Sequence, residues 1–166
     1  MAKMQRRVGG PAWTPGDPTL TVGEIAERLS PIAPDVSGTV QRIRHWTREQ
    51  MLLPVDQLHA GTGKHRQYSA DAVYDAAILH IATNAGLNIS SQRYLVDALT
   101  KARIAVPKWK GERDKGRARP LYLRIDRSAN RTDTTGVEIL WDDAGKPSDD
   151  LTIIIDLARL FARVGG

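Results

Sequence analysis

The chain has 166 residues, enough for one ordinary domain or two small ones, and its 41% of hydrophobic and 26% of charged residues are normal for a globular protein. The absence of cysteine excludes disulfides and thiolate metal sites, and no apolar run approaches the ~20 residues that cross a bilayer. The formal net charge is +5, and its excess lies in residues 101–119, which hold eight basic and two acidic residues and suit a polyanionic partner.

Two short helices are predicted near the N-terminus, after a flexible arm of residues 1–19 that is rich in glycine, proline and basic side chains. The first helix spans Thr21–Leu29, and Thr21 and Glu24 have the spacing of a capping box. The second spans Thr39–Glu49, with either its first residue or Ser37 as the N-cap. Its apolar stripe, which should face the first helix, consists of Val40, Ile43 and Trp46.

A hairpin and two more helices are predicted to follow. Residues 55–68 contain two glycines and a basic cluster, a composition typical of a tight hairpin. Ser69 then caps a helix that ends at Gly86. A further helix begins at Asn88 and ends before Pro107, because proline interrupts the hydrogen bonding of a helix.

The C-terminal third of the chain has strand patterning. Residues 106–119 are predicted to be a basic linker, and residues 120–166 a small separate module. An alternating strand at 121–126 and two short strands at 137–141 and 151–155 predict a three-stranded antiparallel meander. The last predicted element is a helix whose apolar face consists of Leu157, Leu160, Phe161 and Val164.

Two short helices joined by a turn, the second of them basic, fit a helix-turn-helix, whose second helix is able to enter the DNA major groove. The predicted fold class is α+β. A winged helix-turn-helix with following helices occupies residues 20–105, and a small antiparallel β meander with one helix follows the linker. The outward face of the second helix carries long donors, of which Gln41 and Arg42 suit base edges and Arg44, His45 and Arg48 suit phosphates.

Four motifs give the chain a resemblance to the MerR family of DNA-binding proteins. They are Val22-Gly23-Glu24-Ile25-Ala26, then Arg44-His45-Trp46-Thr47-Arg48-Glu49 with Leu52-Leu53-Pro54, then Gly63-Lys64-His65-Arg66-Gln67-Tyr68-Ser69, and last Gly86-Leu87-Asn88-Ile89. The resemblance covers about residues 20–100. It implies that the second helix reads the major groove while Arg66 and Tyr68 on the wing contact phosphate. The full set of candidate DNA-binding residues is Thr39, Gln41, Arg42, Arg44, His45, Arg48, Lys64, His65, Arg66 and Tyr68.

These features favour a cytoplasmic, sequence-specific double-stranded-DNA-binding protein that acts as a MerR-like transcriptional regulator, with RNA polymerase as a candidate partner. No enzymatic activity, cofactor or membrane association is expected. A metal site is not expected either, since His45 and His65 lack a second metal ligand at helical spacing. Two alternatives stay open. One is a phage or mobile-element accessory protein, excisionase-like or terminase small-subunit-like, and the other is a protein-interaction adaptor that does not bind DNA.

A homodimer is also expected. The family's long dimerising helix has no counterpart, since Pro107 and Gly111 interrupt the sequence where it should lie. A three-stranded sheet with one helix buries little surface alone, so the apolar face of the last helix is predicted to pair two copies. The alternative is that residues 120–166 fold back onto their own N-terminal domain.

Overall fold

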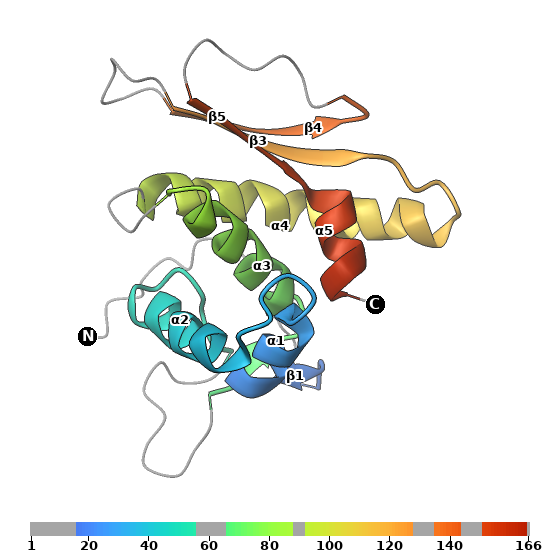
Figure 1. The fold of residues 1–166 in the computed structure, drawn as a ribbon. Coiled ribbons are helices and arrows are strands. Elements are labelled where there is room, and N and C mark those ends of the chain that lie inside the picture. The colour runs from blue at the N-terminus through green and yellow to red at the C-terminus, as the bar shows by residue number, and fades with distance from the viewer. Residues whose placement is uncertain (1–15, 56–65, 88–91, 128–134, 144–150, 166) are drawn as a thin grey trace, which may run out of the picture.

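The structure, a computed structural model, describes residues 16–55, 66–87, 92–127, 135–143 and 151–165. Its elements in chain order are β1 (Thr19–Leu20), α1 (Val22–Leu29), α2 (Val36–Arg48), β2 (Tyr68–Ser69), α3 (Ala72–Asn84), α4 (Gln92–Asp114), β3 (Leu121–Arg127), β4 (Thr135–Trp141), β5 (Leu151–Asp156) and α5 (Leu157–Val164). The expected α+β class is confirmed. Figure 1 shows α1 and α2 at one end, the sheet of β3, β4 and β5 at the other, and the remaining helices between them.

The start of α1 is fixed by the predicted capping box. The Thr21 N–H donates to Glu24 Oε2 at 2.7 Å, and the Glu24 N–H donates to Thr21 Oγ1 at 3.3 Å. These bonds satisfy backbone donors that the first turn of a helix leaves without partners. Ile25 and Leu29 lie on the inner side of the helix and are fully buried.

The helix α2 begins earlier than expected. Its N-cap is Asp35, whose Oδ1 accepts the N–H of Gly38 at 2.9 Å. The two expected caps are therefore wrong: Ser37 lies inside the helix, and the Thr39 hydroxyl donates to the Asp35 carbonyl oxygen at 2.7 Å. Aspartate, serine and threonine are all good N-caps, so residue type alone does not choose between the three positions. The expected burial of Trp46 is confirmed, since only 3% of it is exposed.

A two-stranded antiparallel sheet joins β1, which precedes α1, to β2, which precedes α3. It pairs Thr19 with Ser69 and Leu20 with Tyr68. Residue 19, expected in the arm, is thus a strand residue, and so is Ser69, which does not cap α3. The other predictions for this region lie outside the described residues, namely the arm up to residue 15, the hairpin turn within 56–65 and the helix cap at Asn88.

The C-terminus of α3 confirms that Gly86 ends this helix. The Gly86 N–H donates to the Thr83 carbonyl at 3.0 Å, and the Leu87 N–H donates to the Ala82 carbonyl at 3.0 Å, which are the two bonds of a Schellman motif. The φ angle of Gly86 is +93°, a conformation in which a larger side chain would be strained.

The helix α3 is the centre of the molecule. Residues 72–80 are all buried, and the helix contacts α1, α4, α5 and β5. A helix that is apolar on every side is typical of a core position. The two polar side chains in this buried run, Asp75 and His80, both have partners on neighbouring helices.

The helix α4 overturns two predictions, because it continues through Pro107 to Asp114. Most of the expected basic linker is thus helical, and a long helix does follow the N-terminal unit. A proline inside a helix costs about 3 kcal/mol. Burial of Val106 and Trp109 stabilises this stretch by more, about 1.5–3 kcal/mol for the valine and about 4–6 kcal/mol for the indole at ~25 cal/mol per Å².

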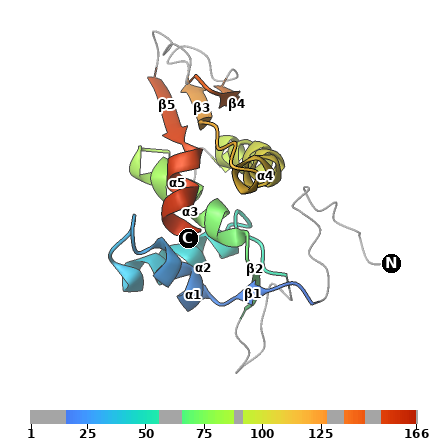
Figure 2. The same cartoon turned by 90° about the vertical axis from the view of Figure 1, so that its right-hand side faces the viewer.

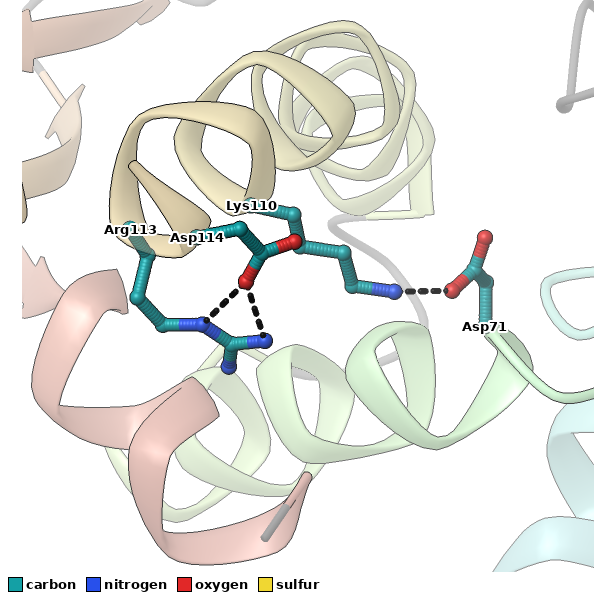
Figure 3. A network of polar contacts seen from close by, with 4 residues as sticks. All are labelled: Asp71, Lys110, Arg113 and Asp114. Atoms are coloured by element: carbon teal, nitrogen blue, oxygen red, sulfur yellow. Dashed lines mark hydrogen bonds and ion pairs between the residues drawn. The ribbon is translucent and has the colours of Figure 1, made fainter. Parts of the chain in front are cut away.

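The last turns of α4 are also held by charge. Figure 3 shows Lys110 reaching from α4 to Asp71, the residue before α3, where Nζ lies 2.7 Å from Oδ1. The Lys110 ammonium also lies 4.5 Å from the ring centre of Tyr74. Arg113, by contrast, binds its own neighbour Asp114 and makes no link to α3 in this view.

The C-terminal sheet is antiparallel, as expected, but it is not a meander. Its strand order is β4-β3-β5, so that β3 is central and both other strands are edges. The alternation predicted for β3 is confirmed, because Leu121, Leu123 and Ile125 are fully buried against the helices. The apolar run of β5 is not buried on both faces, since Ile154 is 37% exposed.

The C-terminal module folds back onto its own chain, which was the alternative to self-association. Figure 2 shows β5 above α5 and β4 above α4, with α5 beside α3. Phe161 of α5 packs edge-on against Tyr74 of α3 and Trp109 of α4, with ring centres 4.7 Å and 5.7 Å apart. The apolar face proposed for dimerisation is therefore covered, since all four of its residues are buried: Leu157, Leu160, Phe161 and Val164.

Candidate nucleic-acid interface

The outward face of α2 carries a row of long polar side chains. Thr39, Ile43, Trp46 and Thr47 are buried on one side of this helix. The opposite side, at helical spacings of three and four, is exposed and consists of Ser37, Gln41, Arg44 and Arg48. His45 is half-buried on the flank of this row. A helix with this division docks by its apolar side and leaves its donors available to a ligand.

The guanidinium groups of Arg44 and Arg48 have no carboxylate partner among the described residues, and both side chains are exposed. The basic stretch at residues 101–119 differs. Six of its eight cations form ion pairs, namely Lys101, Arg103, Lys110, Arg113, Lys115 and Arg119. The part of the sequence with the largest charge excess is thus largely neutralised within the molecule, while the arginines of α2 are not.

Arg42 occupies a different place from the rest of the candidate set. It is exposed at the edge of α2, and its Nη1 lies 3.1 Å from Nδ1 of His80 on α3. The other ring nitrogen, Nε2, lies 3.0 Å from Nδ2 of Asn84. Burial lowers the pKa of His80, and the positive charge of Arg42 lowers it further, so the neutral imidazole is able to accept a hydrogen bond from Arg42.

We expect Arg42→Ala to raise the pKa of His80 while leaving it below its ordinary value of 6.5, because burial is the larger cause of the depression. The measurement is a titration of the imidazole resonances by NMR in the wild type and the variant. In both proteins the contribution of His80 to stability is lost as the pH falls below 6.5, because the unfolded chain then binds the proton that the folded chain does not. An unchanged pKa in the variant would show that Arg42 does not face this ring.

Two candidate residues are withdrawn from the interface because they are buried. Thr39 is 2% exposed, and Tyr68 is 0% exposed with its hydroxyl 2.8 Å from Oγ1 of Thr47. Tyr68 therefore packs β2 against α2 and does not present its hydroxyl to a phosphate. Arg66 is half-buried two residues before β2. Lys64 and His65 lie outside the described residues.

Comparison with models of protein families and with curated proteins finds no match to this chain. The described residues contain no group of three or more side chains able to hold a metal ion. None of the helices in the described ranges is both long enough and apolar enough to cross a membrane.

Proposed function

We propose that the protein binds double-stranded DNA sequence-specifically, with α2 in the major groove, and acts as a MerR-like transcriptional regulator. The observation that carries this proposal is the exposed row of α2, in which Gln41, Arg44 and Arg48 lie on one face and no carboxylate of the described residues neutralises the arginines. Gln41 is the candidate for base edges, because its amide is able to form two hydrogen bonds with adenine. The two arginines are the candidates for phosphate.

The arrangement around α2 supports this use. The helix is held from behind by α1 and by the Thr47–Tyr68 hydrogen bond, so its position does not depend on the ligand. Arg42, fixed by His80, lies beside the row and has its guanidinium partly directed by that bond. A preorganised donor loses less conformational entropy on binding than a free one.

Removing the α2 arginines should weaken binding to every duplex. We expect Arg44→Ala and Arg48→Ala each to lower the slope of log K against log salt by about one unit, because each lost phosphate contact leaves one counterion less to release. The measurement is fluorescence anisotropy with random-sequence duplexes over a range of salt concentrations. Arg159→Ala is the matched control, since Arg159 is an exposed arginine on α5, and it should leave the slope unchanged.

The same titration separates the alternatives. A slope that none of the α2 substitutions changes would remove α2 from the interface, and absence of salt-dependent binding would favour the adaptor. A phage or mobile-element role differs from regulation in its DNA site, which selection from random duplexes identifies. A homodimer on two half-sites belongs to the proposal, but its contact surface is not the covered apolar face of α5.

A further inference from the structure

A groove of about 620 Å³ lies between α4 and the edge strand β4, on the side of the molecule formed by the C-terminal module. Its floor comes from the inner face of β4, where Val137, Ile139 and Trp141 face the helix, and its wall from Ile104 of α4. Ile104 is 73% exposed, the largest exposure among the big apolar side chains of the described residues. Figure 2 shows β4 above α4 on the side away from α5.

In the part of the chain that the structure describes, one edge of β4 pairs with no other strand. The Asp142 N–H donates to the Pro120 carbonyl at 3.1 Å, which places the even-numbered residues of β4 in hydrogen bonds with β3. In an antiparallel pair the alternate residues direct their backbone groups away from the partner, so those of Ile139 point outward. The neighbouring outward carbonyl, that of Val137, accepts a bond from Lys101 Nζ. Among the described residues, the outward backbone groups of Ile139 have no hydrogen-bond partner, so this residue is the open position of the edge.

The charges at the groove are basic. Lys101 lies at one end, and Lys108 at the other, with its ammonium 5.2 Å from the ring centre of Trp141. Lys108 has no carboxylate partner within the described ranges, and the exposed Lys101–Asp97 pair, at 3.5 Å, is of a kind that exchanges readily with another carboxylate. The nearby carboxylate of Glu138 is turned to Arg124 on the other side of the sheet, 3.3 Å away.

We propose that this groove binds an extended acidic segment of a partner protein, which adds to β4 as a fourth strand. Its backbone pairs with Ile139, as in other complexes in which a peptide extends a sheet. An apolar side chain of the segment covers Ile104, and acidic side chains two residues before and after it reach Lys101 and Lys108. The spacing fits, because two turns of α4 separate these lysines by about 10 Å, and strand residues four apart lie about 13 Å apart.

The test uses a short labelled peptide in which glutamate, isoleucine and glutamate alternate with threonine, titrated with the full chain in the absence of DNA. We expect saturable binding by fluorescence anisotropy, weakened about tenfold or more by Ile104→Asp or by Lys108→Glu. Ile154→Asp is the matched control, since Ile154 is exposed on the other edge strand, and it should bind normally. The amide of Ile139 should exchange its hydrogen more slowly in the complex.

Three kinds of result would overturn the proposal. The first is no saturable binding at about 1 mM peptide, the weak limit of specific recognition. The second is equal binding of a peptide with lysine in place of glutamate, or equal binding by the Ile104→Asp variant. The third is a concentration-dependent dimer in sedimentation that Ile104→Asp dissociates, because a second copy of the chain would then occupy the edge. None of these results bears on the α2 interface, which lies on other helices.

Discussion

Trp109→Ala is expected to lower the free energy of unfolding by about 3–5 kcal/mol, measured by urea titration. Trp109 is 3% exposed and packs edge-on against Phe161, so the substitution empties the seam between α4 and α5. The same indole lies under the guanidinium of Arg113, 5.2 Å from the ring centre. The expected loss is large because α4 and α5 meet at this side chain and neither helix is able to close the cavity alone.

Trp109→Phe is the matched control for this prediction. The indole Nε1 is buried and has no hydrogen-bond partner in the described part of the chain, and such an unsatisfied donor costs about 1–3 kcal/mol. Phenylalanine keeps a ring against Phe161 and removes the donor, so we expect a change of only about 1 kcal/mol. A Trp109→Ala variant as stable as the wild type would mean that residues 106–119 act as the linker the sequence predicts.

Features of the fold that depend on local signals were predictable from the sequence. The Thr21–Glu24 capping box and the Schellman ending at Gly86 each involve a few neighbouring residues and one backbone conformation. The burial of Trp46 and the alternation of β3 follow from periodicity, which reports the face that an element buries.

Features that depend on distant packing were not predictable in this way. Pro107 is a local signal for the end of a helix, but it is outweighed by the burial of Val106 and Trp109 against elements that lie far away in the sequence. The strand order is a second example. β3, β4 and β5 follow one another with the same patterning whether β4 or β3 is central, so the pairing of β3 with β5 requires the structure.

The candidate site shows the same division. Helical periodicity predicted the exposure of Gln41, Arg44 and Arg48, because these residues lie opposite the apolar stripe. It did not predict the contact between Arg42 and His80, which belong to different helices. The motif that contains Tyr68 gave its position in the chain but not its burial against Thr47.

Breaking the buried ion pair between α3 and α4 should destabilise the protein by about 3–5 kcal/mol, because a charge without a partner is left in the core. In this pair, Nη2 and Nε of Arg103 lie 2.8 Å and 2.9 Å from Oδ2 of Asp75, and both side chains are largely buried. We expect Asp75→Ala and Arg103→Ala each to show a loss of this size in urea unfolding at pH 8. Lys115→Ala, which removes an exposed pair with Glu112, should change stability by less than about 1 kcal/mol.

The stability losses of Asp75→Ala and Arg103→Ala should change with pH in opposite directions. Burial raises the pKa of Asp75 from 3.8 to about 6, against the lowering effect of Arg103. The folded wild type therefore binds a proton that the unfolded chain does not, and its stability from this group decreases as the pH rises from about 4 to about 6. Asp75→Ala lacks this titration. The difference in free energy of unfolding between this variant and the wild type should therefore grow as the pH falls from 8 to 5.

Arg103→Ala should behave in the reverse way. Loss of the arginine removes the influence that lowers the pKa of Asp75, so the carboxyl group becomes protonated at a higher pH and the buried charge is neutralised. The stability lost by the Arg103→Ala variant relative to the wild type should therefore shrink as the pH falls from 8 to 5. Comparing each variant with the wild type at the same pH cancels the titration of groups common to all three proteins, including His80. Deficits that change with pH in the same direction would contradict the raised pKa of Asp75.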